Sequence, residues 1–202
     1  MIYFHEGDLP TDVQFKNSVA VDTETMGLDL NRDRLCLVQL SGGDKNCHIV
    51  RFMPGQYNAP NLKKLFADAS VLKLFQYGRF DIASIYKYLG VLCQSVYCTK
   101  IASKIGRTNA PSHSLKSLCD SLLNVELAKE QQCSDWGAEK LSDQQLTYAA
   151  NDVLYLHELK EKLDAILIRE NRLDIAQACF DFLPMVAKMD VIGYACENIF
   201  IH

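Results

Sequence analysis

Two carboxylates directly follow a short apolar run near the N-terminus. Residues 19–21 are Val-Ala-Val, Asp22 and Glu24 come next with one residue between them, and a turn containing Gly27 follows. An apolar, mostly β-branched run that ends in a turn predicts a buried strand. Because residues two apart on a strand share a face, Asp22 and Glu24 should project side by side from the end of this strand.

Carboxylates held this close repel one another unless a cation neutralises them, and hard oxygen ligands favour Mg²⁺ or Mn²⁺. The pair therefore predicts a metal site. An Asp-x-Glu pattern is also common in surface turns, so residues further along the chain have to decide between the two interpretations.

The composition is that of an ordinary globular chain. Its 202 residues are 49% hydrophobic and 23% charged, which predicts a single domain over residues 1–202. No apolar run reaches the roughly 18 residues of a membrane span, and the N-terminus lacks the pattern of a signal peptide. We therefore expect a cytoplasmic protein without a membrane partner. The formal net charge of −4 does not indicate a nucleic-acid binder, although bound cations would neutralise part of it.

The chain contains eight cysteines, and their spacing carries little information about function. None forms a Cys-x-x-Cys pair, and the spacings match no zinc framework. Several lie in apolar stretches, so buried, reduced thiols are the favoured interpretation.

The hydrophobic pattern changes along the chain from strands alone to alternating strands and helices. Short apolar runs joined by polar turns predict an antiparallel meander first, and helical spacing begins at Asn61. This order predicts an α/β fold, with a mixed sheet flanked by helices. The expected strands cover residues 2–5, 18–24, 35–40, 47–52, 71–75 and 95–98, and helices are expected over residues 80–89, 99–105 and 114–123 as well as after Asn61.

The C-terminal part of the chain is predicted to be helical. Residues 142–145 form a capping-box pattern, and the helix that they start keeps its apolar period to Leu159. A second helix, containing Leu173, should end at Pro184, because proline removes a helical hydrogen bond. Residues 184–202 form an apolar tail that must pack either on its own domain or on a second subunit.

Two later motifs supply further acidic groups. Asp81 opens an expected helix just after a strand, and Tyr148 and Asp152 are i and i+4 on one face of a C-terminal helix. Alone, each has an ordinary interpretation, as a helix-start aspartate or as a solvated carboxylate beside a half-buried aromatic ring. Together with Asp22 and Glu24 they supply four carboxylates and one phenol. That set suits two cations that clamp the attacking and leaving oxygens of a phosphodiester displacement.

In this order the motifs resemble those of the DEDDy 3′-5′ exonucleases of the ribonuclease D branch. The residues Asp22-Thr23-Glu24 match the first motif of that family, Asp81 matches the second, and Tyr148 with Asp152 matches the third. Ser134-Asp135-Trp136 is also similar to that branch. Within the branch the chain resembles the compact nanoRNase C group over nearly its whole length. The resemblance implies an RNase H-like (DnaQ-like exonuclease) fold and no appended helical nucleic-acid-binding domain.

The resemblance also implies roles for these residues. Asp22, Glu24 and Asp152 would hold one of two divalent cations, Mg²⁺ or Mn²⁺, with Asp22 bridging to the second. Asp81 would contribute to the metal site largely through metal-bound waters. Tyr148 would orient the attacking water rather than act as a strong base, because a phenol stays protonated near neutral pH.

Substrate contacts are assigned from the resemblance and from residue type. Leu28 matches a leucine that wedges between the last two bases, although it also fits an apolar cap of a turn. Gln76 stands where the family often has histidine, so its contact to base or sugar stays open. A basic set between the second and third motifs suits either phosphate recognition or a solvated helix face; it consists of Lys100, Lys104, Arg107 and Lys116 with His113. The assigned substrate-binding residues are Leu28, Gln76, Arg79, Lys104, Arg107 and His113.

By this resemblance, the chain is expected to be a 3′-5′ exoribonuclease that hydrolyses very short RNA, dinucleotides in particular, to nucleoside 5′-monophosphates. One alternative is a general 3′-end trimming exonuclease for longer RNA or DNA, which would grip its substrate over many phosphates. Another is an inactive domain kept for binding, against which the intact set of carboxylates argues. Because nanoRNase C-like proteins form octameric rings, we expect a homo-oligomer, an octamer, in which the apolar tail is buried.

Overall fold

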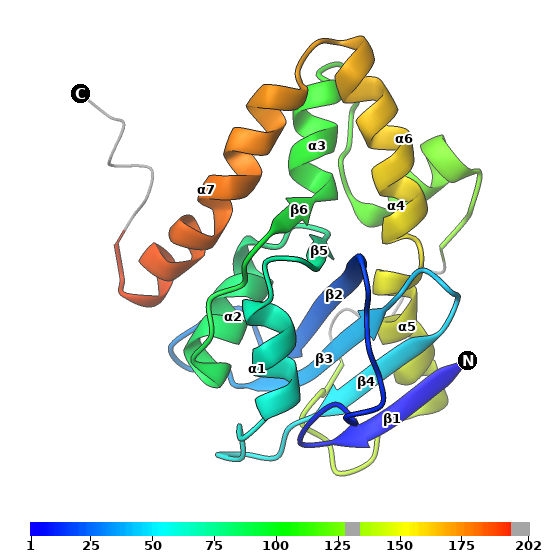
Figure 1. The fold of residues 1–202 in the computed structure, drawn as a ribbon. Coiled ribbons are helices and arrows are strands. Elements are labelled where there is room, and N and C mark those ends of the chain that lie inside the picture. Colours follow the sequence, from blue (N-terminus) through cyan, green and yellow to red (C-terminus); the bar gives the residue numbers. More distant parts are fainter. Residues whose placement is uncertain (128–133, 195–202) are drawn as a thin grey trace.

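The computed structural model describes residues 1–127 and 134–194, and the strands in this part of the chain form one six-stranded sheet (Figure 1). The strands are β1 (Ile2–Glu6), β2 (Ser18–Thr25), β3 (Leu35–Ser41), β4 (Cys47–Arg51), β5 (Leu72–Phe75) and β6 (Val96–Cys98). Their order across the sheet is β1-β4-β3-β2-β5-β6. β2, β3 and β4 pair antiparallel as the predicted meander, whereas β1–β4, β2–β5 and β5–β6 pair in parallel. The predicted mixed sheet is confirmed.

Helices pack on the sheet and on one another (Figure 1). They are α1 (Pro60–Ala67), α2 (Arg79–Leu89), α3 (Thr99–Gly106), α4 (Leu115–Leu118) with its π-helical continuation η1 (Cys119–Leu123), α5 (Asp143–Leu154), α6 (Leu156–Arg169) and α7 (Leu173–Val191). α5 lies across β1 to β4, and α2 packs against β2, β3 and α7. α3, α6 and α7 contact one another beyond the end of the sheet. α2 and α5 thus both contact β2, the strand that carries Asp22 and Glu24.

The start of α5 is confirmed, but its predicted length is wrong. The Ser142 hydroxyl accepts from the Gln145 backbone N–H at 3.2 Å, and the Gln145 side chain accepts from the Ser142 N–H at 2.9 Å. The helical period to Leu159 predicted one helix, whereas the chain turns at Tyr155 and continues as α6. α5 packs on the sheet while α6 packs on α3 and η1, and one straight helix cannot reach both surfaces.

The prediction that Pro184 ends a helix is also wrong, because α7 continues through it to Val191. Phe180, Leu183, Pro184 and Ala187 form the buried face of α7 against α2 and β6. Burial of this face offsets the one hydrogen bond that proline removes.

Part of the apolar tail thus packs on its own domain. Met185, Ile192 and Tyr194 stay largely exposed in the isolated chain. Phe200 and Ile201, also part of the predicted tail, lie outside the described residues.

No helix in residues 1–127 or 134–194 is long and apolar enough to cross a membrane. Cysteines 36, 47, 93, 98 and 119 are free and buried, as expected for reduced thiols, whereas Cys179 is free and exposed. Cys133 and Cys196 lie outside the described residues.

Candidate active site

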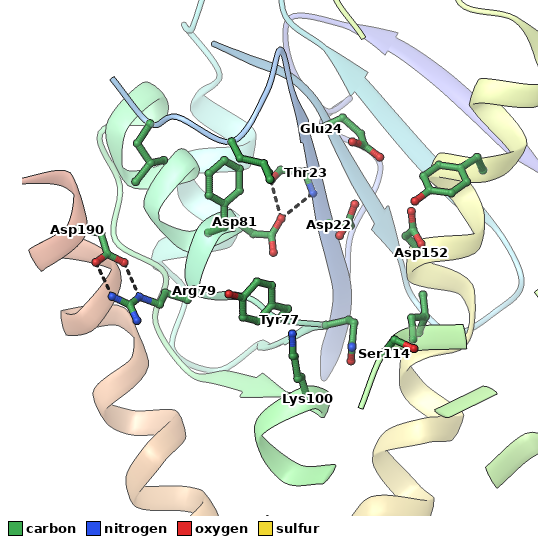
Figure 2. Close-up of a pocket in the computed structure, with 16 residues that line it drawn as sticks. Asp22, Thr23, Glu24, Tyr77, Arg79, Asp81, Lys100, Ser114, Asp152 and Asp190 are labelled. Carbon is green, nitrogen blue, oxygen red and sulfur yellow. Dashed lines mark hydrogen bonds and ion pairs between the residues drawn. The ribbon is translucent and has the colours of Figure 1, made fainter. Parts of the chain in front are cut away.

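The first and third motifs meet at the end of the central strand β2. Asp22 and Glu24 project from the face of β2 that α5 covers, and Asp152 of α5 points toward them (Figure 2). One carboxylate oxygen from each of the three lies within 4.8 Å of the others. The strand pairing shifts register between Glu24 and Thr25, a bulge of the kind that re-aims side chains beside active sites.

The second motif reaches the same place from the opposite face of the sheet. Asp81 lies in the first turn of α2 and is 6% exposed. Its Oδ1 accepts hydrogen bonds from the Thr23 N–H at 3.1 Å and from the Thr23 hydroxyl at 2.6 Å (Figure 2). Because Thr23 lies between Asp22 and Glu24 and points to the other face, these bonds place Asp81 at the same strand end.

Tyr148 lies one helical turn before Asp152, and its ring packs beside Trp136 with a centroid separation of 6.0 Å. The predicted phenol thus stands next to the predicted carboxylates. Trp136 belongs to the Ser134-Asp135-Trp136 stretch that carries part of the family resemblance, and its role here is to support the Tyr148 ring.

Burial raises the pKa values of all four carboxyls, and repulsion from neighbouring carboxylates adds to this effect at Asp22, Glu24 and Asp152. Burial raises the pKa of Asp22 well above its usual range, and the charges of Asp81, Asp152 and Glu24 add to that effect. The pKa of Glu24 rises to about 9, first through burial and then through Asp152 and Asp81. Burial also raises the pKa of Asp81 to about 7, against its two bonds from Thr23, and that of Asp152 to about 7.

The donor set fits a divalent cation. Three hard oxygen ligands converge, and no lysine or arginine among the described residues forms an ion pair with any of them. Buried carboxylates left without a counter-charge are costly, whereas Mg²⁺ and Mn²⁺ take oxygen ligands and supply that charge. Asp22, Glu24 and Asp152 are the residues that would hold it.

A cavity of about 570 Å³ opens beside the carboxylates, and Figure 2 shows the side chains that line it. Leu28 stands at its rim and is 84% exposed. The lining residues are Asp22, Thr23, Glu24, Leu28, Leu30, Gln76, Tyr77, Arg79, Phe80, Asp81, Lys100, Ser114, Leu115, Tyr148, Asp152 and Asp190. All five residues of the three motifs are among them.

Half of the assigned substrate-binding residues line this cavity. Leu28, Gln76 and Arg79 do, but Lys104, Arg107 and His113 do not. Lys104 is exposed on α3, the Arg107 guanidinium donates to the Ser121 hydroxyl at 2.9 Å, and His113 Nδ1 lies 2.8 Å from the Ser103 hydroxyl.

The side chain of Gln76 is engaged within the protein. Its amide nitrogen donates to the His113 carbonyl at 3.0 Å, and its oxygen accepts from the Thr99 hydroxyl. Gln76, directly after β5, is therefore bonded to the segment of His113 and Ser114, of which Ser114 lines the cavity. Arg79 is also engaged, through a bidentate ion pair with Asp190 of α7 at 2.7 and 2.8 Å.

Sequence reasoning did not assign Tyr77, Lys100, Ser114 and Asp190 to the site. The Lys100 ammonium lies 3.5 Å from the centre of the Tyr77 ring (Figure 2), a cation–π contact at the cavity wall. Lys100 was visible in the sequence as one member of the basic set. Asp190 carried no local signal, because it reaches the cavity through α7, 111 residues beyond Arg79.

A family model described as 3′-5′ exonuclease matches residues 7–168. The chain belongs to this 3′-5′ exonuclease family. Among relatives of this exonuclease, DNA polymerase I of Aquifex aeolicus is 37% identical over 154 residues, which cover 76% of this chain and 24% of that protein. Ribonuclease D of Gluconacetobacter diazotrophicus is 33% identical over 156 residues, covering 77% of this chain and 39% of the relative. The chain thus spans well under half the length of these curated relatives.

Solved structures extend the similarity of this exonuclease to its full length. Brucella melitensis NrnC is 50% identical with a TM-score of 0.95, over 100% of this chain and 98% of that one. NrnC has also been solved bound to pGG and with bound Mg²⁺. Escherichia coli RNase D is 26% identical with a TM-score of 0.73, over 86% of this chain and 45% of that one. The predicted ribonuclease D and nanoRNase C resemblance and the RNase H-like fold are confirmed.

We expect the stability of the metal-free exonuclease to fall as the pH rises from about 6.5 to about 8. Asp81, Asp152 and Glu24 have folded pKa values of about 7, 7 and 9, so the folded state holds protons that the unfolded state has lost above about pH 4. Burial lowers the pKa values of His5, His48, His113 and His157, and this gives an opposite slope that fades above about pH 7, where the unfolded state is also largely neutral. Lys73, whose pKa burial lowers to about 8, adds an opposite slope toward the upper end of the interval, but the carboxyls of the cluster outnumber it.

The measurement is the melting temperature with chelator present, which should drop by about 5 °C or more across this interval. Saturating Mg²⁺ should remove most of the drop, because it binds the ionised carboxylates. Asp22→Asn, which removes one of the repelling charges, should give a shallower fall. A melting temperature that rises with pH would contradict the assignment of raised pKa values to this cluster.

Tyr148→Phe should lower kcat by about 10²-fold, less than loss of a metal ligand, because only a positioning hydroxyl disappears. The ring keeps its packing beside Trp136, so the melting temperature should stay close to that of the wild type. Steady-state kinetics on a dinucleotide would measure the effect. A loss as large as that of Asp22→Ala would mean that the phenol takes part in the chemistry more directly.

Proposed function

We propose that this protein is a 3′-5′ exoribonuclease that hydrolyses very short RNA, dinucleotides above all, to nucleoside 5′-monophosphates. The observation that carries the proposal is the convergence of Asp22, Glu24 and Asp152 in a cavity of a chain that is 50% identical, end to end, to Brucella NrnC. That NrnC has been solved bound to pGG supports a substrate of this size.

The proposed cofactor is a pair of divalent cations, Mg²⁺ or Mn²⁺. When bound, such cations acidify a water and stabilise the charge that develops on the attacking and leaving oxygens. Asp22, Glu24 and Asp152 would hold them, with Asp81 held ready nearby by Thr23. Mg²⁺ binding by NrnC, together with the uncompensated charge of this cluster, supports the assignment.

The remaining side chains of the cavity would orient the substrate. The Tyr148 hydroxyl would align the attacking water, and exposed Leu28 would stack against the terminal bases. Lys100, held over the Tyr77 ring, is the cation best placed along the cavity wall for a phosphate of the substrate.

The size of the cavity supports a preference for short substrates. A volume of about 570 Å³ lies within the range of small-molecule sites. A long RNA gains affinity from many phosphate contacts along a basic track. In contrast, the basic side chains that line the cavity in the described part of the chain are Lys100 and Arg79, and Arg79 is already paired with Asp190.

A general 3′-end trimming exonuclease for longer RNA or DNA is the second candidate. The observation in its favour is the similarity to segments of DNA polymerase I and ribonuclease D, proteins much longer than this chain. Both candidates use the same carboxylate site, so they differ only in the length and sugar of the substrate.

The experiment that tests the reaction uses a 5′-labelled RNA of about five nucleotides with Mg²⁺. We expect labelled products that shorten one nucleotide at a time from the 3′ end, down to a labelled mononucleotide. A matched DNA and an RNA with a blocked 3′ end serve as controls. Internal cleavage, or shortening from the 5′ end, would overturn the proposal.

We also propose that the protein is a homo-oligomer, an octamer, that works in the cytoplasm. On α7, Ile175, Cys179, Phe182 and Met185 recur at helical spacing on the outer side and are exposed in the isolated chain. A contiguous apolar stripe of this kind is typical of an interface, and closed symmetry would bury it in every copy.

Assembly is tested by light scattering at micromolar concentration. The double variant Ile175→Asp with Met185→Asp should scatter as a smaller particle than the wild type. The variant Gln177→Asp, changed on the same helix but outside the stripe, should keep the wild-type size. A wild-type protein that scatters as a monomer would refute the assembly without affecting the proposed reaction.

A further inference from the structure

A buried glutamine lies directly beside the carboxylate cluster. Gln39 of β3 pairs with Asp22 of β2 in the antiparallel register, and directly paired residues point to the same face of a sheet. Gln39 is 0% exposed, and neither its amide nitrogen nor its amide oxygen has a hydrogen-bond partner. Buried polar groups are normally paired, so this residue calls for a specific explanation.

Nothing in the packing of β3 requires an amide at this position. The β4 residue Ile49, which pairs with Gln39 and therefore shares its face of the sheet, is fully buried and apolar. A methionine or leucine would fill the same space without leaving two polar atoms unpaired, and would be the more stable choice. A residue that breaks such a local rule beside a functional site is expected to serve that site.

We propose that Gln39 is a positioning residue for Asp22. Its amide N–H donates to one oxygen of the Asp22 carboxylate when a cation is bound. This contact fixes the carboxylate plane, so that the other oxygen faces the cation. The Cβ atoms of directly paired residues lie about 4.5–5.5 Å apart, so rotation of the Gln39 side chain is sufficient to make the bond.

The inference rests on the proposed function, because it needs Asp22 to be a metal ligand. It assigns to Gln39 the outer-shell role that hydrogen-bonded partners of ligating carboxylates commonly have, and loss of such partners costs about 10- to 100-fold in metal affinity or activity.

The test is Gln39→Met, with Gln39→Leu as a second apolar variant should the first fail to fold. The metal-free melting temperature should equal or exceed that of the wild type, because two unpaired polar atoms are removed. Titration with Mn²⁺ alone, followed calorimetrically, should show affinity lowered by about 10-fold or more. On a dinucleotide, kcat should fall while KM changes little, since Gln39 does not line the cavity.

Tyr97→Phe is the matched control. It removes one buried hydroxyl from β6, and the Tyr97 side chain does not line the cavity. Its affinity for Mn²⁺ and its kcat should match the wild type. Unchanged Mn²⁺ affinity and kcat in the Gln39 variants would overturn the proposal and leave Gln39 as an unfavourable core residue. If instead the wild type binds no Mn²⁺ and hydrolyses nothing, the proposed function fails first.

Discussion

Replacing Asp22 with alanine should lower kcat for dinucleotide hydrolysis by about 10³-fold or more, while the protein stays folded. Asp22 lies at the centre of the cluster, where its carboxyl interacts with Asp81, Asp152 and Glu24. No other described side chain is placed to take over as a ligand between the two sides of the site. The loss should therefore appear in kcat and in metal affinity together.

The metal-free Asp22→Ala protein should melt at or above the wild-type temperature, because one member of a repelling, buried group is removed. Asp44→Ala, which deletes an exposed carboxylate in the turn after β3, is the matched control and should leave kcat unchanged. A soluble Asp22→Ala protein with near-normal hydrolysis would contradict the metal assignment.

Removal of divalent cations should abolish hydrolysis, and added Mg²⁺ or Mn²⁺ should restore it. The reason is electrostatic: burial raises the pKa values of all four carboxyls, and a bound cation would supply the counter-charge that lets them ionise. The rate with EDTA should fall to that of a no-enzyme sample. EDTA already saturated with Mg²⁺ is the control for effects of the chelator itself. Full activity after exhaustive chelation would exclude the proposed use of the cluster.

The strand and cap predictions came from local patterns and therefore held. The apolar run before Asp22 is β2, and the Ser142–Gln145 capping box starts α5. These features depend on neighbours within a few residues, which a sequence displays directly. The carboxylate cluster was predictable for a related reason, since each acidic residue marks the end of a recognisable strand or helix.

Features that depend on tertiary packing could not be derived in this way. The continuation of α7 through Pro184 depends on the surface offered by α2 and β6, and the break at Tyr155 depends on where α3 lies. The Arg79–Asp190 ion pair joins residues 111 positions apart. No local pattern carries that information.

The basic set shows that sequence spacing alone does not identify which basic residue lines the cavity. Lys100 and Lys104 are i and i+4 on α3, so their spacing places them on the same helix face. One helical turn advances about 5.4 Å, which is enough to separate a residue that lines the cavity from one that does not. Sequence spacing identified the face, whereas the structure identified Lys100 as the residue at the cavity.

For Gln39, the structure shows a conflict between a polar side chain and its buried position that the sequence pattern does not show. Within an apolar strand it reads as one polar residue among buried ones. Only the register against Asp22 and the unpaired amide give it a role at the site.

Whether this site acts on very short RNA is tested by a rate ladder. Initial rates with Mg²⁺ are compared for 5′-labelled RNAs from two to about twelve nucleotides, at concentrations well below KM. We expect the highest kcat/KM for the dinucleotide and a decline with length. The cavity accommodates a small ligand, and the described residues of its wall offer few cations for further phosphates. Equal rates along the ladder, or rates that rise with length, would contradict this expectation and favour general 3′-end trimming.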